Sequence, residues 1–235
     1  MLIFIEKYFS RAILKRMKLF FFTPFIFLIL AELVHPVRPN FQISKQLTEL
    51  NFPPEVLSLG SFGQKRLLAS LMWIETLLES DLEHYKKKDY NSWMFLRFKS
   101  IAKLHPYFYE NYLVGGLYLS VIKDDDLGAM EIYEKGLEVY PQDDRLLYYA
   151  GMHTLLELED KKKALSFLLP LMERPKTPFQ TKTLITKLLS ENNQYDLGLL
   201  YLKDLLKMLP EGEWRNIILK RIKKIQELKE KYPDA

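Results

Sequence analysis

Histidines and cysteines are the first side chains to consider for metal binding or catalysis in this sequence. The four histidines, His35, His84, His105 and His153, are scattered, and no two stand at the spacing that places metal ligands on one helix face. The absence of cysteine excludes thiolate metal sites and disulfides. We therefore predict no catalytic, cofactor or metal site, and we expect a protein that is not an enzyme.

Two short motifs resemble ligand loops. The acidic run Asp124–Asp126 lacks the alternating ligands and closing glutamate of a calcium loop, so we interpret it as a solvated turn in which Asp126 caps a helix. The stretch Gly60–Lys65 lacks the spacing of a phosphate-binding loop and follows no strand, so we interpret it as the start of a helix with Ser61 as N-cap. Asp160 is a third predicted N-cap.

Basic residues concentrate at the two ends of the chain. Residues 1–18 hold five basic residues and one acidic residue, which accounts for the whole net charge of +4, so the rest of the chain is neutral. This distribution argues against a nucleic-acid-binding protein. From Arg215 to Lys231 the sequence holds seven basic residues against Glu227 and Glu230. This second cluster is typical of either a solvated helix face or a surface for anionic lipid headgroups or an acidic partner.

An apolar segment follows the first basic cluster. Leu19–Ala31 is uncharged, and Leu33 and Val34 extend it beyond Glu32. We predict that residues 1–34 form a basic region plus a membrane-directed helix, with membrane contact through residues 19–34. A cleaved signal peptide and an uncleaved anchor both remain open, as does a start at Met17. The positive-inside rule places the rest of the chain on the exported side of the membrane, the periplasm in a bacterium.

Proline marks the next segment. Residues 35–54 contain four prolines and no helical period, so we predict that residues 35–60 form a tether between membrane and folded body.

A pattern of small, aromatic and proline residues organises the remainder. Its clearest copy lies between Tyr112 and Pro141, and parts of it recur at intervals of about 35 residues. A Gly or Ala on each of two crossing helices lets their backbones approach, a bulky residue one turn on fills the gap beside them, and a proline stops the second helix. The recurring residues are Tyr112, Gly115, Gly116, Leu119, Ala129, Tyr133, Gly136 and Pro141, then Gly151, Ala164 and Leu168, then Gly198, Leu202, Leu205 and Pro210, with Met94, Phe98, Ile101 and Pro106 upstream.

This pattern resembles the tetratricopeptide-repeat family over roughly Ser61–Pro210, most specifically in the central unit. The resemblance implies an all-α fold: an antiparallel helix-pair solenoid of about four units over residues 61–210. Residues 211–235 then form a basic capping helix, and a hydrophobic helix precedes the body. The predicted helices are Phe62–Leu82, Tyr90–Leu104, Tyr107–Ile122, Asp126–Tyr140, Asp144–Leu158, Lys161–Met172, Phe179–Ser190, Gln194–Leu209 and Trp214–Tyr232.

The resemblance also implies a binding surface. In this family the first helices of successive units line a concave groove, so we expect a membrane-tethered or exported scaffold that binds another protein or peptide segment there. The alternative is a structural envelope protein whose basic C-terminal helix contacts anionic lipid headgroups. The predicted groove residues are Glu110, Leu113, Leu117, Ser120, Arg145, Tyr148, Met152, Leu155, Gln180, Thr183 and Lys187.

Overall fold

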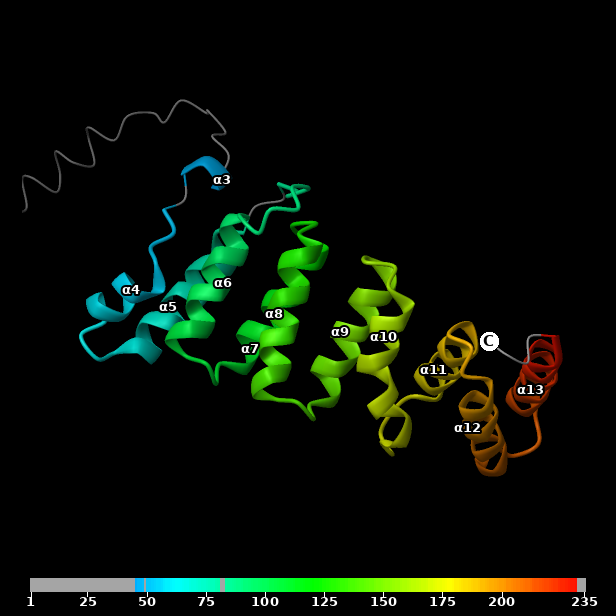
Figure 1. Cartoon of the computed structure of the whole chain (residues 1–235). Helices are drawn as coiled ribbons and strands as arrows, with labels where there is room; N and C mark the ends of the chain where they lie inside the picture. The colour runs from blue at the N-terminus through cyan, green and yellow to red at the C-terminus, as the bar shows by residue number, and fades with distance from the viewer. Residues whose placement is uncertain (1–44, 49, 81–82, 232–235) are drawn as a thin grey trace, which may run out of the picture. The chain divides into compact units, whose positions relative to one another are not determined.

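The computed structural model describes residues 45–48, 50–80 and 83–231, all within one compact unit, Ser44–Ala235. Of these described residues 74% are helical and none is in a strand, which confirms the all-α prediction (Figure 1). The elements are α3 (Lys45–Thr48), α4 (Pro54–Gly60), α5 (Lys65–Leu78), α6 (Trp93–Leu104), α7 (Tyr109–Val121), α8 (Asp126–Val139), α9 (Asp144–Leu156), α10 (Lys161–Leu168), the 3-10 helix η1 (Leu169–Glu173), α11 (Phe179–Glu191), α12 (Tyr195–Met208) and α13 (Glu213–Lys231).

The predicted membrane-directed segment, residues 1–34, lies outside the described residues. Among the helices that the structure describes, none is long and apolar enough to cross a bilayer.

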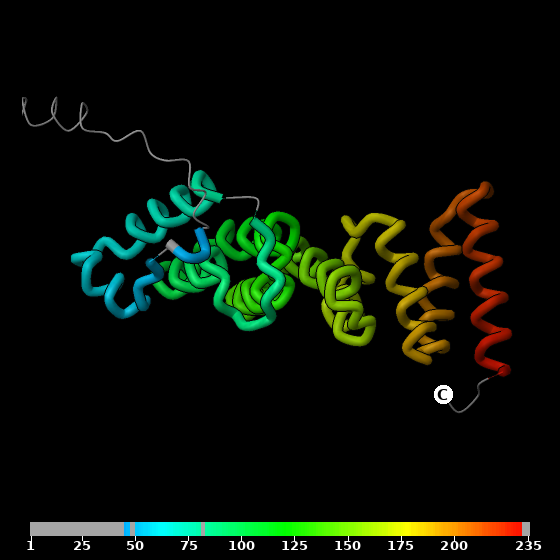
Figure 2. Tube along the Cα trace, turned by 90° about the horizontal axis from the view of Figure 1, so that it is seen from above, coloured from blue at the N-terminus to red at the C-terminus, as the bar shows by residue number. Residues whose placement is uncertain are grey.

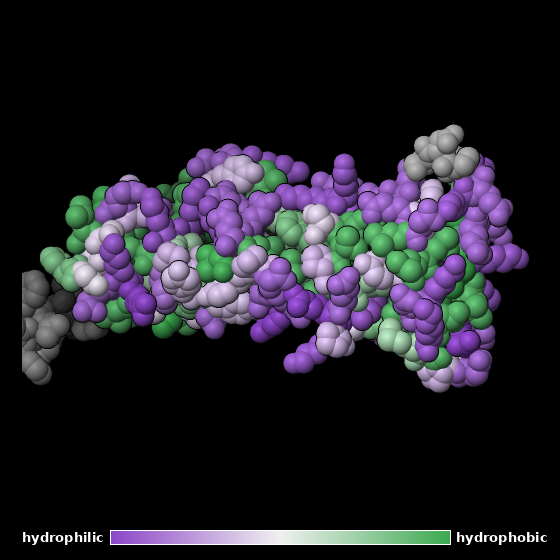
Figure 3. Space-filling model, turned by 60° about the horizontal axis from the view of Figure 1, so that its bottom comes forward, coloured by the Kyte–Doolittle hydropathy of each residue, from purple (hydrophilic) through white to green (hydrophobic). Residues whose placement is uncertain are grey.

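Neighbouring helices along the chain pack on one another from α5 to α13. The pairs α5–α6, α7–α8, α9–α10 and α11–α12 follow in order, and α13 packs on α12 (Figures 1 and 2). Apolar residues are buried between the helices, and hydrophilic residues cover much of the face seen in Figure 3. This arrangement is compatible with a helical solenoid.

Prolines end three of the helices at the predicted places. Pro106, Pro141 and Pro210 each stand two residues beyond the last residue of α6, α8 and α12. A proline has no N–H to continue the helical hydrogen-bond ladder, which explains why the chain turns there.

The turn inside each of three successive pairs repeats a backbone conformation. Asp124, Glu159 and Asn193 have φ values of 53°, 54° and 62°, and they lie 35 and 34 residues apart. The N–H of the following residue then reaches back to a carbonyl of the first helix, as in a helix C-terminal motif. These bonds run from Asp125 to Leu119 (2.9 Å), from Asp160 to Thr154 (3.1 Å) and from Gln194 to Leu189 (2.8 Å).

The central helices cross closely at glycines, as predicted. A Cβ on Gly116 would lie 2.5 Å from the Tyr133 ring, and a Cβ on Gly151 would lie 2.5 Å from the Leu168 side chain. Such distances are too short for real atoms, so both positions require glycine in this packing.

The N-terminal part of the body differs from the sequence prediction. The proline pattern predicts no helix before Ser61, yet Lys45–Thr48 form α3 and Pro54–Gly60 form α4. Pro54 stands in the first turn of α4, where a missing N–H costs nothing. The next helix, α5, begins at Lys65 and not at Phe62, because Phe62 and Gly63 have φ values of 47° and 85°.

Two predicted N-caps are also corrected. The Ser61 hydroxyl donates to the Ser58 carbonyl at the end of α4 and caps no helix start. Asp125 rather than Asp126 caps α8, since its Oδ1 accepts from the Gly128 N–H at 3.0 Å. The third prediction is confirmed, because Asp160 accepts from the Lys163 N–H at 2.9 Å.

Helix α10 is shorter than the predicted Lys161–Met172. It ends at Leu168, and the chain continues as η1 with Pro170 in its first turn. Pro170 lacks the N–H that an α-helix would need at this point, and this explains the change to 3-10 geometry.

Candidate functional site

The expected groove lies along the first helices of the central and last pairs. Helix α7 packs on α9, whereas α11 packs on its partner α12, on α10 and on η1. The two central first helices are therefore neighbours.

The predicted groove residues of α7 divide into buried and exposed side chains. Leu113 is only 6% exposed and belongs to the core, so in this structure its side chain packs against neighbouring helices and is not open to a ligand. Glu110 is exposed, and Leu117 is 38% exposed. Two of the four α7 residues thus remain open to a ligand.

The Ser120 side chain is hydrogen-bonded to another helix of the fold. Its Oγ lies 3.0 Å from Nδ1 of the buried His153, and Nε2 of His153 lies 2.8 Å from the Asp126 backbone oxygen. A carbonyl only accepts, so Nε2 donates to the Asp126 oxygen, and Nδ1 pairs with the Ser120 hydroxyl. Ser120 and His153 therefore connect α7, α8 and α9.

The α9 residues contribute to a hollow of about 400 Å³, which we call the α9 pocket. Its volume is within the range of ligand-binding cavities. The walls combine apolar and aromatic surface with a few charged groups. The lining residues are Asp144, Arg145, Tyr148 and Tyr149 of α9, Leu171 of η1, and Lys176, Thr177 and Pro178 of the loop before α11.

Two tyrosines form the aromatic part of the α9 pocket. The rings of Tyr148 and Tyr149 meet edge to face, with centroids 5.6 Å apart and planes at 82°. Tyr148 is 36% exposed, so part of its ring is available to another molecule. An edge-to-face pair is a favourable aromatic geometry and holds the exposed ring in place.

The charged residues that line the α9 pocket differ in whether they have an ion-pair partner. Oδ1 of Asp144 lies 3.3 Å from Nε of Arg174, which offsets the acidic charge. Within the described residues, Arg145 and Lys176 have no ion-pair partner. The pocket therefore presents net positive charge beside an aromatic wall.

The remaining predicted groove residues do not line the α9 pocket. Met152 and Leu155 are half-buried. On α11, Gln180 is exposed, Thr183 donates its hydroxyl to the Gln180 carbonyl at 2.8 Å, and Lys187 pairs with Glu191 at 3.6 Å.

Sequence reasoning found Arg145 and Tyr148 but missed their neighbours in the α9 pocket. Tyr149, Leu171 and Lys176 come from three different elements. Pro170, within the predicted helix, was the available signal that the chain changes geometry before Leu171 and forms a wall there.

The acidic turn Asp124–Asp126 faces lysines. The turn and Lys86–Lys88 line a hollow of about 320 Å³, and Oδ2 of Asp124 lies 2.5 Å from Nδ1 of His84. Burial raises the pKa of Asp125. Within the described residues, no group of three potential metal ligands comes together, here or elsewhere.

Some basic side chains of the C-terminal helix α13 form hydrogen bonds with neighbouring helices. Arg215 donates to the Leu206 and Leu209 carbonyls at the end of α12, at 3.1 and 3.2 Å, and Arg221 donates to the Thr183 carbonyl at 2.9 Å. The first two bonds go to carbonyls at the end of α12, where the helix no longer supplies its usual partners, and the third joins α13 to α11. The ammonium group of Lys229 pairs with Asp196, which leaves Lys220, Lys223 and Lys224 among the exposed cations.

Comparison of the chain with protein-family models gives no match, and comparison with curated proteins gives none either. The helical pairing and the geometry of the α9 pocket are therefore the basis for assigning a function.

Proposed function

We propose that this protein is a membrane-tethered or exported interaction scaffold of the tetratricopeptide-repeat type, and that it binds a segment of a partner protein at the α9 pocket. The observation that carries the proposal is this pocket, where an aromatic pair lies beside Arg145 and Lys176. The repeated turns and glycine crossings support the repeat type, and the apolar segment 19–34 supports the tether.

The chemistry of the pocket suggests the kind of partner. Tyr148, Tyr149 and Leu171 offer apolar contact for one aromatic or aliphatic side chain. Arg145 and Lys176 offer charge-assisted hydrogen bonds to an acidic side chain next to it. We therefore expect an extended or helical segment that carries an apolar anchor beside an acidic residue.

The test is site-specific cross-linking in the native membrane. A photoreactive phenylalanine analogue in place of Tyr148 should cross-link one protein species, and the same analogue at the exposed Tyr107 should not. In the purified full chain, Tyr148→Ala with Arg145→Glu should weaken binding of a peptide from that species at least tenfold, because an aromatic anchor and a charge partner are lost. Tyr107→Ala is the matched control. Equal cross-linking at both positions, or unchanged binding by the double variant, would exclude the α9 pocket as the binding site.

A second candidate function rests on α13. Lys220, Lys223 and Lys224 are exposed there and suit anionic lipid headgroups, at about 1 kcal/mol for each cation near the surface. Replacement of all three by glutamine should then abolish salt-sensitive co-sedimentation with phosphatidylserine vesicles. Co-sedimentation that persists in this variant would reject the role of α13.

A further inference from the structure

The chain before α5 is attached to the N-terminal end of α6. The Gln46 side chain bonds two backbone groups there: its Nε2 donates to the Asn91 oxygen at 2.7 Å, and its Oε1 accepts from the Trp93 N–H at 2.9 Å. Trp93 is the first residue of α6, so its N–H has no partner within the helix. Helix α4 also packs on α6. The folded body therefore includes the chain from α3 onward.

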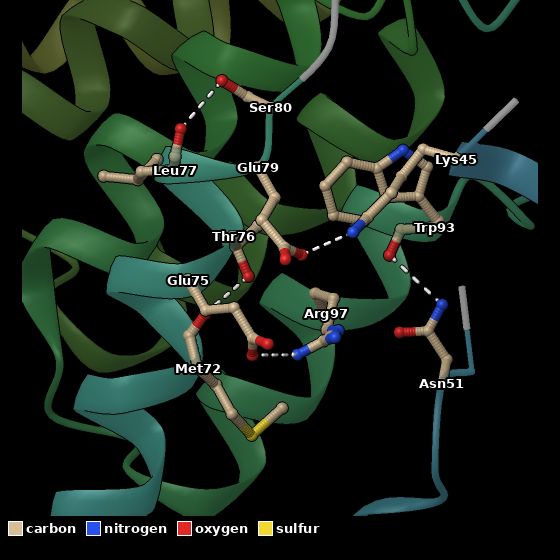
Figure 4. Close-up of polar contacts among 10 residues, drawn as sticks. All are labelled: Lys45, Asn51, Met72, Glu75, Thr76, Leu77, Glu79, Ser80, Trp93 and Arg97. Carbon is tan, nitrogen blue, oxygen red and sulfur yellow. Dashed lines mark hydrogen bonds and ion pairs between the residues drawn. The ribbon is translucent and has the colours of Figure 1, made fainter. Parts of the chain in front are cut away.

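Two further contacts hold this segment in place (Figure 4). Nζ of Lys45 lies 2.5 Å from Oε2 of Glu79, just after the end of α5, and Nδ2 of Asn51 donates to the Trp93 carbonyl at 3.4 Å. Nζ of Lys45 also lies 5.6 Å from the centre of the Trp93 ring, a distance at which a cation and an aromatic ring attract one another. The position of the chain at Lys45 is thus fixed on the body.

These contacts limit the length of the proposed membrane tether. Only residues 35–44 lie between the apolar segment 19–34 and Lys45. An extended chain spans at most 3.3–3.6 Å per residue, so this stretch spans roughly 35 Å at most. A chain tethered in this way keeps the N-terminal end of its body close to the bilayer.

Large apolar side chains are exposed at the turn between α4 and α5. Val56 and Leu59 are 52% and 81% exposed and stand three residues apart, which places them on one side of α4. Phe62, in the turn that follows, is 93% exposed. We call these three residues the α4 tip. Leu57, by contrast, packs against the core, so the α4 tip is the side of this segment that is left in water.

The α4 tip lies within reach of the proposed tether. Gln46 binds at the first residue of α6, and Glu55 of α4 pairs with Lys103 near the end of the same helix. A rise of 1.5 Å per residue makes α6 roughly 18 Å long. This length is well below the span of residues 35–44, so the α4 tip can reach the surface of the bilayer.

The charges around the α4 tip favour lipid headgroups. Lys65 and Arg66 follow it in the chain, are exposed, and have no ion-pair partner within the described residues. The acidic residue of α4, Glu55, is already paired with Lys103. Apolar side chains next to unpaired cations are the combination that enters a bilayer interface: the apolar groups leave water, and the cations remain at the phosphates.

We propose that the α4 tip is a membrane-contact surface, which inserts Leu59 and Phe62 among the headgroups of the bilayer while Lys65 and Arg66 contact lipid phosphates. The proposal rests on the membrane tether of the proposed function. A few side chains suffice for this contact, because the tether keeps them at a high effective concentration near the bilayer. Two attachments, the tether and the α4 tip, then hold the body in one orientation, whereas a tether alone leaves it free to turn.

Fluorescence quenching of the full chain in vesicles tests this contact, and the absence of cysteine allows a single label. Leu59→Cys carries a nitrobenzoxadiazole probe, and the vesicles contain phosphatidylcholine, phosphatidylserine and a lipid with a nitroxide quencher. We expect at least threefold stronger quenching than for the same probe at Leu200→Cys, which is 54% exposed on α12, because only an inserted probe approaches the nitroxide. Equal quenching at both positions would overturn the proposal.

Flotation of the same vesicles in a density gradient reports on the tether separately. A chain that floats while the probe at position 59 stays unquenched retains its tether and rejects the α4 tip as a membrane contact. A chain that does not float rejects both the tether and the α4 tip.

Substitutions at the α4 tip provide a second measurement. Phe62→Asp should lower the quenching at position 59 at least twofold, with unchanged flotation and an unchanged helical circular dichroism signal, because a carboxylate opposes insertion. Leu156→Asp, at a position that is 61% exposed on α9, is the matched control and should leave the quenching unchanged. Unchanged quenching in the Phe62→Asp chain would contradict insertion.

Two further experiments separate lipid from protein as the occupant. Lys65→Gln with Arg66→Gln should lower the quenching in vesicles with phosphatidylserine and leave it unchanged in phosphatidylcholine alone, because the attraction requires anionic headgroups. A photoreactive phenylalanine analogue at Phe62 should link to lipid in native membranes. Links to protein alone would overturn the proposal. None of these outcomes depends on ligand binding at the α9 pocket.

Discussion

The pair α7–α8 and the pair α11–α12 share one spacing of residues, but the two pairs pack differently. In α7–α8, Gly116 lies against the Tyr133 ring, so a glycine and a large aromatic residue complement one another. In α11–α12 the corresponding positions, 69 residues on, hold Ile185 and Leu202, which are both fully buried but belong to separate core clusters. The shared spacing therefore sets where helices end and which positions are buried. The sizes of the residues at the crossing set how closely the helices approach.

The helix starts differ in the same way. Asp125 caps α8 with its side chain, whereas Gln194, at the start of α12, makes no side-chain cap bond. The central pair is thus defined by more specific local interactions than the last pair.

The largest expected effect of a single methyl group is at Gly116. Gly116→Ala places a Cβ 2.5 Å from a buried aromatic ring that has little room to move, so we expect a loss of about 1–3 kcal/mol in the free energy of unfolding. Urea unfolding followed by circular dichroism measures this loss. A Gly116→Ala protein as stable as the wild type would mean that the helices cross less closely than described.

The cap of α8 predicts a pH effect. Burial raises the pKa of Asp125, so the folded state holds its proton more tightly than the unfolded state does. This contribution to the free energy of unfolding is present in acid and is lost as the pH rises from the ordinary aspartate pKa through the raised value. Asp125→Asn keeps a capping oxygen but cannot ionise. Relative to this variant, the wild type should therefore lose stability as the pH rises through that window, in urea titrations at a series of pH values. A constant difference would contradict the raised pKa.

The smallest expected effect is an increase in the free energy of unfolding, at Gly198. A Cβ on Gly198 would meet the Thr186 carbonyl oxygen at 3.5 Å and the Leu189 Cβ at 3.6 Å, which are ordinary contacts. The corresponding residue of the central pair is Ala129, fully buried. Gly198→Ala should therefore stabilise the protein by up to about 1 kcal/mol, because alanine has the higher helix propensity. Thermal unfolding measures the shift, and a destabilised variant would show that α11 and α12 cross as closely as the central helices.

These comparisons show which helix ends and caps could be predicted from the sequence. Pro106, Pro141 and Pro210 gave three helix ends, because a missing N–H acts locally and does not depend on the rest of the fold. Pro170 also lacks the N–H, but the predicted helix Lys161–Met172 continues through it. The choice between Asp125 and Asp126 as N-cap depended on a turn conformation that neither residue type specifies.

The α9 pocket was harder to predict than the helices. Arg145 and Tyr148 followed from their place on α9, but Leu113 fits the same spacing and is buried. The burial of one position on a helix depends on how neighbouring helices tilt against it, which the spacing along a single helix does not specify. The exposed apolar side of α5, where Leu67 and Leu71 are each 56% exposed, could not be recognised from the sequence, because an apolar face looks the same whether or not a neighbour covers it.

The recurring left-handed turn has a consequence for protein engineering. Because Asp124 and Glu159 adopt the same backbone conformation 35 residues apart, the segment between them behaves as a cassette with matching ends. Removal of this cassette joins Asp124 to Asp160. Asp160 normally follows Glu159, which has the same left-handed φ as Asp124. We therefore expect the body to tolerate removal of one cassette without the design of a new loop.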